Sequence, residues 1–206
     1  MKQQITLPAG LSYTKDGSLG DLCLIIDMQN VYLPNQPWAC RATSEVSQTI
    51  QNLIDLKAAD NFIFTRYIAT NQPIGAWSNY NQAYADINSN PWMNEIISNL
   101  QPYTNTYPVY DKSTYSSYHN PEVAQLCKLA NRVLITGVVA ECCVLATAYS
   151  AIDAGNKIVY LKDAVTGLSQ ETEAITEQLI GNFAPIHTKL MTVDDYKQER
   201  AASSET

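Results

Sequence analysis

Three side chains in this sequence are of types that together could break a covalent bond: the carboxylate of Asp27, the ammonium of Lys112 and the thiol of Cys143. Each comes shortly after an apolar run that could form a β-strand. Ligands of open parallel sheets bind at the carboxyl ends of the strands. We therefore expect the three side chains to converge at one edge of such a sheet.

The chemistry that this set offers is nucleophilic catalysis by a cysteine. Cys143 is predicted to open a helix, whose first-turn amides and dipole lower a thiol pKa and can hold an oxyanion. Asp27 could take the thiol proton as a general base, while a nearby Lys112 would favour the thiolate and the carboxylate. Each residue alone has a simpler explanation, as a helix cap, a solvated charge or a core thiol. The prediction therefore depends on their joint placement.

The elements that must position these residues are short strands alternating with amphipathic helices. The apolar runs are continuous rather than alternating, which indicates a sheet covered on both faces. Strand–helix alternation predicts right-handed βαβ crossovers and a three-layer α/β/α sandwich in a single domain of residues 1–206. The predicted strands are 22–26, 61–65, 106–110, 132–137, 157–161 and 189–193, and helices are expected over 44–59, 123–130, 144–155 and 175–183.

One long segment, residues 67–104, is rich in aromatic side chains and has no clear period. Long loops of compact domains tend to be functional, so its rings either pack locally, line a substrate pocket or form a subunit contact. We predict Tyr67, Trp77 and Tyr80 as substrate-binding residues. The segment has no Lys or Arg and only two acids, a charge-poor composition that protein–protein contacts favour, with Trp77 or Trp92 as the expected contact.

Composition limits the partners of this 206-residue chain. Its net charge is −7 and no basic cluster could grip phosphates, which argues against nucleic acid. No apolar run approaches a membrane-spanning length, and residues 1–5 lack the apolar core of a signal peptide. The five cysteines form neither a disulfide framework nor a zinc ribbon, which fits a reducing compartment. We therefore expect a cytoplasmic protein that acts on a small molecule.

Three sequence blocks resemble the isochorismatase-like hydrolases, a family that includes nicotinamidases and N-carbamoylsarcosine amidase. Residues 24–30, LIIDMQN, resemble the family's opening of a hydrophobic run followed by Asp, Met or Gln, Gln, and Asn or Asp. Residues 112–118, KSTYSSY, are similar to its Lys-x-x-aromatic-Ser-small-aromatic segment, and residues 136–144, TGVVAECCV, to its nucleophile signature. The blocks stand in family order, and the resemblance covers roughly residues 19–195.

The resemblance implies a cysteine hydrolase in which Asp27 is the base, Lys112 its cationic neighbour and Cys143, rather than Cys142, the nucleophile. Because some relatives cleave a vinyl ether and lack this cysteine, its presence favours the branch that hydrolyses amide or carbamoyl C–N bonds through a thioester. The non-enzymatic alternative is a binding or scaffold member of the same fold. A nucleotide-binding flavodoxin-like module is disfavoured because no Gly-rich loop follows the first strand.

The resemblance also implies a six-stranded, mainly parallel sheet in the order 3-2-1-4-5-6 and a homo-oligomer, either a dimer or a tetramer. The family's cis peptide bond falls between Val138 and Val139, where it would turn the Val139 amide toward the Cys143 amide to form an oxyanion hole. Ala140-Glu141 replaces the Thr-Asp of the signature, and Val139 the usual Ala, which leaves the three predicted catalytic residues in place.

The positions of the histidines bear on two further questions: whether the site holds a metal, and whether a histidine activates Cys143. Nicotinamidases hold a metal with an Asp-x-His cluster and further histidines after the second strand, whereas residues 65–71 here contain neither Asp nor His. We therefore expect no metal and no other cofactor. His119 offers a competing Cys–His pair with Cys143, although a surface turn position explains it as well, and His187 is expected to have no catalytic role.

Overall fold

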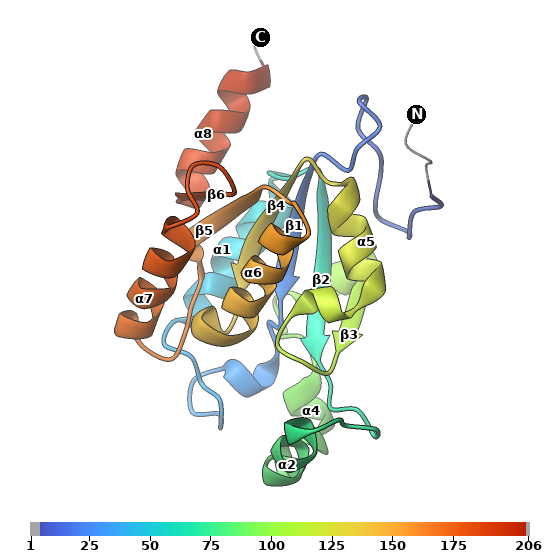
Figure 1. The fold of residues 1–206 in the computed structure, drawn as a ribbon, viewed down its shortest axis with the longest axis vertical. Coiled ribbons are helices and arrows are strands. Elements are labelled where there is room, and N and C mark those ends of the chain that lie inside the picture. Colours follow the sequence, from blue (N-terminus) through green and yellow to red (C-terminus); the bar gives the residue numbers. More distant parts are fainter. Residues whose placement is uncertain (1–4, 205–206) are drawn as a thin grey trace.

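The centre of the protein is a six-stranded sheet with the strand order β3-β2-β1-β4-β5-β6, seen in a computed structural model that describes residues 5–204 (Figure 1). All five strand pairings are parallel. The predicted fold class and strand order are therefore confirmed. The strands are β1 Asp21–Ile26, β2 Asn61–Tyr67, β3 Val109–Lys112, β4 Arg132–Gly137, β5 Ile158–Val165 and β6 Thr188–Met191.

The central strands are buried on both faces, as their continuous apolar sequences predict. Every residue of β1 is buried, and Leu24 lies in register with Ile63 of β2 and Ile135 of β4. The edge strand β3 begins three residues later than predicted because Pro108 has no N–H to donate. The Pro108 carbonyl instead accepts a hydrogen bond from the Phe64 amide at 3.0 Å. As a result Lys112 is the last residue of β3 rather than a loop residue.

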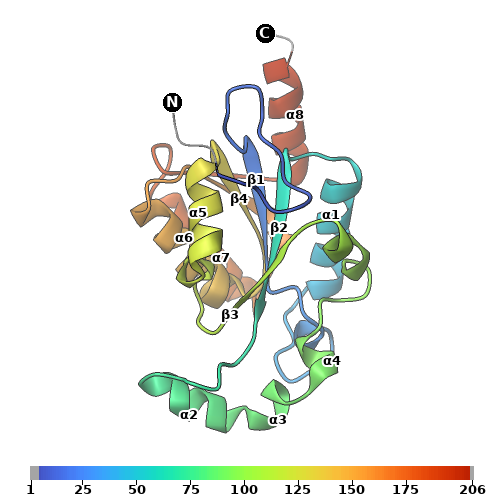
Figure 2. The same cartoon turned by 90° about the vertical axis from the view of Figure 1, so that its right-hand side faces the viewer.

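Helices cover both faces of the sheet (Figure 2). Helices α1 and α8 pack on one face, and α5, α6 and α7 on the other, each with its own buried apolar cluster. The longer helices are α1 Thr43–Asp55, α5 Pro121–Leu129, α6 Leu145–Asp153, α7 Gln170–Gly181 and α8 Val193–Ser204. Within the described residues, no helix is long and apolar enough to span a membrane.

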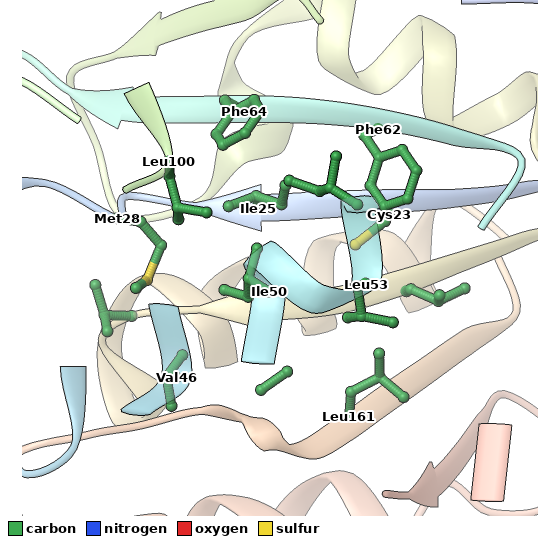
Figure 3. Packing of buried hydrophobic residues seen from close by; sticks show 14 of the residues in the cluster. Cys23, Ile25, Met28, Val46, Ile50, Leu53, Phe62, Phe64, Leu100 and Leu161 are labelled. Atoms are coloured by element: carbon green, nitrogen blue, oxygen red, sulfur yellow. The ribbon is translucent and has the colours of Figure 1, made fainter. Parts of the chain in front are cut away.

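The core between α1 and the sheet is close-packed (Figure 3). Ile50 and Leu53 of α1 are 0% and 1% exposed, and they belong to the same cluster as Cys23 and Ile25 of β1. Burying an aliphatic side chain of this size contributes about 1.5–3 kcal/mol relative to leaving it exposed. This packing fixes β1, and with it the position at which Asp27 leaves the sheet.

The aromatic segment after β2 forms three short helices beyond the carboxyl ends of the strands (Figures 1 and 2). Gly75 precedes the first of them with a φ of 54°. None of the three has a fully buried residue, so the segment is held by its connections to the sheet rather than by a core of its own. The helices are α2 Ala76–Ala83, α3 Ala85–Asn88 and α4 Pro91–Asn94, and 3₁₀ turns occur at Asn30–Tyr32, Gln101–Asn105 and Ser117–His119.

Candidate active site

Asp27 leaves β1 in a conformation that few side chains adopt. Its φ is 52°, in the left-handed region, which Asp tolerates better than most L-residues. The Asp27 amide donates to the Thr65 carbonyl of β2 at 3.1 Å, and its carboxylate Oδ1 accepts from the Thr65 hydroxyl at 3.0 Å. The side chain is 0% exposed. The turn and Thr65 together fix a buried carboxylate at the carboxyl edge of the sheet.

The end of β4 lies against the end of β1, where only glycine fits. Gly137 has a φ of 105°, and a Cβ there would lie 2.1 Å from the Ile26 carbonyl oxygen. The next amide, that of Val138, donates to the same oxygen at 2.9 Å. The peptide bond between Val138 and Val139, for which a cis form was expected, is cis. A π-helical turn, Ala140–Val144, follows at once and continues into α6.

The Lys112 ammonium contacts the other two predicted catalytic residues. Lys112 Nζ lies 2.6 Å from Asp27 Oδ2, and it donates to Cys143 Sγ at 3.5 Å and to the Thr114 carbonyl at 3.0 Å. An ammonium has three N–H groups, so every donor of this buried cation has a partner. The structure therefore brings Asp27, Lys112 and Cys143 together, one from each of three strand ends.

Burial and the neighbouring charges shift the pKa values of Lys112 and Cys143. Burial alone would lower the pKa of Lys112, but the neighbouring Asp27 and Cys143 outweigh it and raise the Lys112 pKa. Burial also raises the pKa of the Cys143 thiol; Lys112 opposes this, and the Asp27 charge adds to it. The expectation that the helix start lowers the Cys143 pKa is thus wrong, because burial dominates. The raised pKa favours the neutral form of the Cys143 thiol, which lies beside the Lys112–Asp27 ion pair.

A neutral thiol must lose its proton before it can act as a nucleophile, and the Asp27 carboxylate has an oxygen that could accept this proton. Its Oδ2 has no hydrogen-bond partner among the described residues apart from the ion-pair contact with Lys112. The charge of the same carboxylate raises the pKa of the Cys143 thiol, so the two groups lie close enough to interact. The arrangement can therefore move a proton from the thiol to Asp27.

Hydroxyl groups connect this carboxylate to α6. The Thr65 hydroxyl lies 3.4 Å from the Ser117 hydroxyl, to which the Thr147 hydroxyl donates at 3.3 Å. Thr147 also accepts from the Ser117 amide at 3.0 Å. All three side chains are fully buried. The network ties the carboxylate to α6, the helix that follows the π-helical turn containing Cys143.

A cavity of about 310 Å³ opens beside the thiol, with Val139 and Cys143 in its wall. Two of the predicted substrate-binding residues, Tyr67 and Tyr80, line it. The third, Trp77, does not: its ring packs 5.0 Å from that of Tyr115 and 5.2 Å from that of Tyr80, as support for the wall. The other lining residues are Tyr32, Pro37, Trp38, Ala39, Tyr84, Tyr115, Cys142 and Leu168.

Sequence reasoning missed most of this wall because it comes from separate parts of the chain. Trp38 contacts the rings of Tyr67, Tyr80 and Tyr84 at centroid distances of 5.3–6.3 Å, although it lies in a different loop. Tyr115 is the aromatic residue of the Lys-x-x-aromatic segment at residues 112–118. Its spacing of three residues from Lys112 is the sequence feature from which its place in the wall could have been predicted.

The histidines take no part in the cluster. His119 is exposed, its Nδ1 lies 2.7 Å from the Thr114 hydroxyl, and it does not line the cavity, so the Cys–His alternative has no geometric support. His187 is exposed in the loop before β6. Among the described residues, no group of three or more His, Cys, Asp or Glu side chains could hold a metal ion.

Comparison with known proteins places this geometry in a family. The sequence model of the isochorismatase domain matches residues 21–195. No curated protein matches the sequence significantly. Among solved structures, a cysteine hydrolase from Pseudomonas syringae pv. phaseolicola is similar with a TM-score of 0.73 and 19% identity, covering 89% of this chain and 93% of that one.

Two further solved structures have a similar fold. An N-carbamoylsarcosine amidase from Thermoplasma acidophilum has a TM-score of 0.66 and 16% identity, covering 85% of this chain and 97% of that chain. A pyrazinamidase of Pyrococcus horikoshii, solved in complex with zinc, has a TM-score of 0.65 and 20% identity, covering 84% of this chain and 98% of that chain.

Proposed function

This chain belongs to the isochorismatase family, and within that family of hydrolases we propose that it cleaves a C–N bond of a small amide or carbamoyl compound through a thioester on Cys143. One observation carries the proposal: the buried Lys112 ammonium contacts both the Asp27 carboxylate and the Cys143 thiol. That contact lies beside a cavity whose wall includes Cys143. A core thiol with no catalytic role would need neither a buried ion pair nor access to a cavity.

In the first half of the reaction, Sγ of Cys143 attacks the carbonyl carbon while Asp27 takes the thiol proton. The negative charge that develops on the carbonyl oxygen is accepted by the backbone amides of Val139 and Cys143, both in the cavity wall. Asp27 then gives its proton to the leaving nitrogen, the C–N bond breaks, and the acyl group remains on Cys143 as a thioester.

In the second half, water hydrolyses the thioester. Asp27, ionised again after protonating the amine, removes a proton from the water as the water oxygen attacks the thioester carbon. The C–S bond of the tetrahedral intermediate then breaks, which releases the acid, and Asp27 returns its proton to the Cys143 sulfur. In the resting site Lys112 is charged, because Asp27 and Cys143 raise its pKa. It holds the carboxylate in place and stabilises the sulfur as negative charge develops on it.

The test is hydrolysis of a panel of small amides, ureas and carbamoyl compounds by the wild type, Cys143→Ala and Cys142→Ala. Cys142 lines the same cavity and provides a matched control for a lost thiol. We expect Cys143→Ala to lose turnover of every substrate that the wild type accepts, while Cys142→Ala retains it. A wild type that hydrolyses no member, with Cys143 no more reactive toward iodoacetamide than the buried Cys23, would favour a non-catalytic binding protein.

A further inference from the structure

Among residues 5–204, no formally charged side chain lines the cavity beside Cys143. Its lining consists of tyrosine, tryptophan and small or apolar residues, together with the two thiols. Lys112, the cation that contacts Cys143, has a side chain that is 0% exposed and is paired with Asp27. An ionised group taken from water into such a wall loses hydration without gaining a partner. The wall by itself therefore favours uncharged ligands.

One charged group lies directly behind this wall. Glu141 is the residue before Cys142, and its Oε1 accepts a hydrogen bond from the amide of Leu168 at 3.1 Å. Cys142 and Leu168 both line the cavity. A Cβ on Gly167 would lie 2.1 Å from Glu141 Oε2, so the glycine makes room for this carboxylate. Oε2 is buried and, within the described residues, has no hydrogen-bond partner.

The charge of Glu141 has no counterion there. Among residues 5–204 it forms no ion pair within 4.0 Å, and the neighbouring Arg41 donates to Glu173 at 2.6 Å instead. The Glu141 charge acts on a residue of the cavity wall. The pKa of the Cys142 thiol is raised mainly by burial and, to a smaller extent, by the Glu141 charge. Burial and the same carboxylate also raise the pKa of Cys40. The Glu141 carboxylate therefore adds a negative contribution to the potential at this part of the cavity.

We propose that Glu141 is a specificity-determining residue that makes the site take uncharged amides and reject amides that carry a carboxylate. The inference rests on the proposed function, and it deepens that function by selecting among small amides on charge. Glu141 touches neither the thiol nor the reacting carbonyl in this proposal. It acts from behind Cys142 and Leu168, through its field.

The experiment compares 4-nitrobenzamide with 4-carbamoylbenzoate, two amides of closely similar shape that differ in charge. The variants are Glu141→Gln, which keeps an oxygen acceptor for the Leu168 amide but removes the charge, and Glu141→Asp, which keeps the charge. Asp194→Asn, at an exposed position in the first turn of α8 and outside the cavity lining, is the matched control for the loss of one negative charge. The readout is the ratio of kcat/KM for the neutral amide to kcat/KM for the carboxylated one.

We expect the wild-type ratio to exceed about ten and to fall about tenfold in Glu141→Gln, as for one charge acting over several ångströms within the protein. Asp194→Asn and Glu141→Asp should keep most of the wild-type ratio. An unchanged ratio in Glu141→Gln, or a wild type that hydrolyses both amides equally, overturns the inference.

Binding of the same two amides, measured by calorimetry, keeps the test independent of turnover. The ratio of the two affinities should fall in Glu141→Gln as the kinetic ratio does, and an unchanged affinity ratio counts against Glu141. If the amides bind with the expected charge preference but no variant, including the wild type, hydrolyses any amide, the proposed function fails and the charge selection stands.

Discussion

At the scale of single residues, Asp27 has two opposite effects on Cys143. Its carboxylate can accept the thiol proton, yet its charge also raises the Cys143 pKa, while Lys112 lowers it. Replacing Asp27 therefore separates thiolate formation from general-base catalysis. Asn is the suitable replacement, because it adopts the left-handed conformation of this turn as readily as Asp does.

We predict that Asp27→Asn lowers the pKa of Cys143 and, at the same time, strongly slows amide hydrolysis. Without the carboxylate, Lys112 alone acts on the sulfur, so alkylation by iodoacetamide should reach half its maximal rate at a lower pH than in the wild type. Amide turnover should fall by about 100- to 10,000-fold, as is usual when a general base is removed. A higher alkylation midpoint, or turnover close to that of the wild type, would contradict the assigned roles.

At the scale of elements, Gln29 connects the site to the aromatic segment. Its side chain donates to the carbonyls of Tyr67 at 3.1 Å and Asn94 at 2.9 Å, and accepts from the Tyr67 amide at 2.8 Å. Asn30 adds a hydrogen bond to the Trp92 carbonyl at 2.8 Å. The two residues after Asp27-Met28 thus hold the chain before α2 and the end of α4, and with them the Tyr67 part of the cavity wall.

We predict that Gln29→Ala destabilises the fold and raises KM more than it lowers kcat. It leaves buried main-chain groups of Tyr67 without partners, at a cost of about 1–3 kcal/mol for each group. Urea unfolding and steady-state kinetics measure the two effects. Gln48→Ala, at an exposed position of α1, is the control and should behave like the wild type. A normal KM in Gln29→Ala would show that the segment is held by other contacts.

The elements also show what sequence could and could not predict. The central strands were predictable because a fully buried strand such as β1 must be apolar at every position. The start of β3 was not predictable in the same way. Pro108 interrupts the apolar strand pattern, yet its carbonyl still accepts a hydrogen bond from β2. The cavity wall was only partly predictable, since Trp38 and Tyr84 meet through folding and share no local pattern. The direction of the Cys143 pKa depends on burial, which spacing does not reveal.

At the scale of the whole molecule, an ion-pair network lies at the end of the sheet opposite the cavity. Asp21, at the start of β1, accepts from Arg132 at 2.6 Å and 2.8 Å, from the Tyr196 hydroxyl at 2.8 Å and from Arg200 at 3.0 Å. Tyr196 and Arg200 belong to α8, so this carboxylate is one of the groups that attach the C-terminal helix to the sheet, together with the Arg200–Asp60 and Arg132–Glu199 pairs.

We predict that acid weakens the attachment of α8. Burial would raise the pKa of Asp21, but Arg132, Tyr196 and Arg200 outweigh it and hold the pKa below its ordinary value of 3.8. A lowered pKa means that Asp21 stabilises the fold fully above about pH 4, and that this contribution is lost as the pH falls through the folded-state pKa. The difference in unfolding free energy between the wild type and Asp21→Asn should therefore shrink in acid. If the difference in unfolding free energy between the wild type and Asp21→Asn stayed constant as the pH falls, the Asp21 ion pairs would not be its source.

We also propose that the protein is a homo-oligomer, a dimer or a tetramer. The aromatic segment extends beyond the body of the molecule and exposes large apolar side chains, with Ile74 78% and Trp92 48% exposed (Figure 2). Trp77 is half-buried against other rings, so Trp92 is the better candidate for the contact. Light scattering at micromolar concentration should give a multiple of the chain mass, reduced in Trp92→Ala. A monomer mass for the wild type would refute the proposal.

The central claim, a thioester on Cys143 that Asp27 helps to hydrolyse, is tested most directly by trapping the acyl-enzyme. 4-Nitrophenyl acetate has a leaving group that needs no proton, so Asp27→Asn should still be acetylated, but without the base its thioester should hydrolyse slowly and accumulate. Peptide mapping by mass spectrometry should then find a hydroxylamine-labile acetyl group on Cys143 of Asp27→Asn, and none at that position when Cys143 is also replaced by Ala. An acetyl group on Cys142 instead, or no accumulation in Asp27→Asn, would contradict the account.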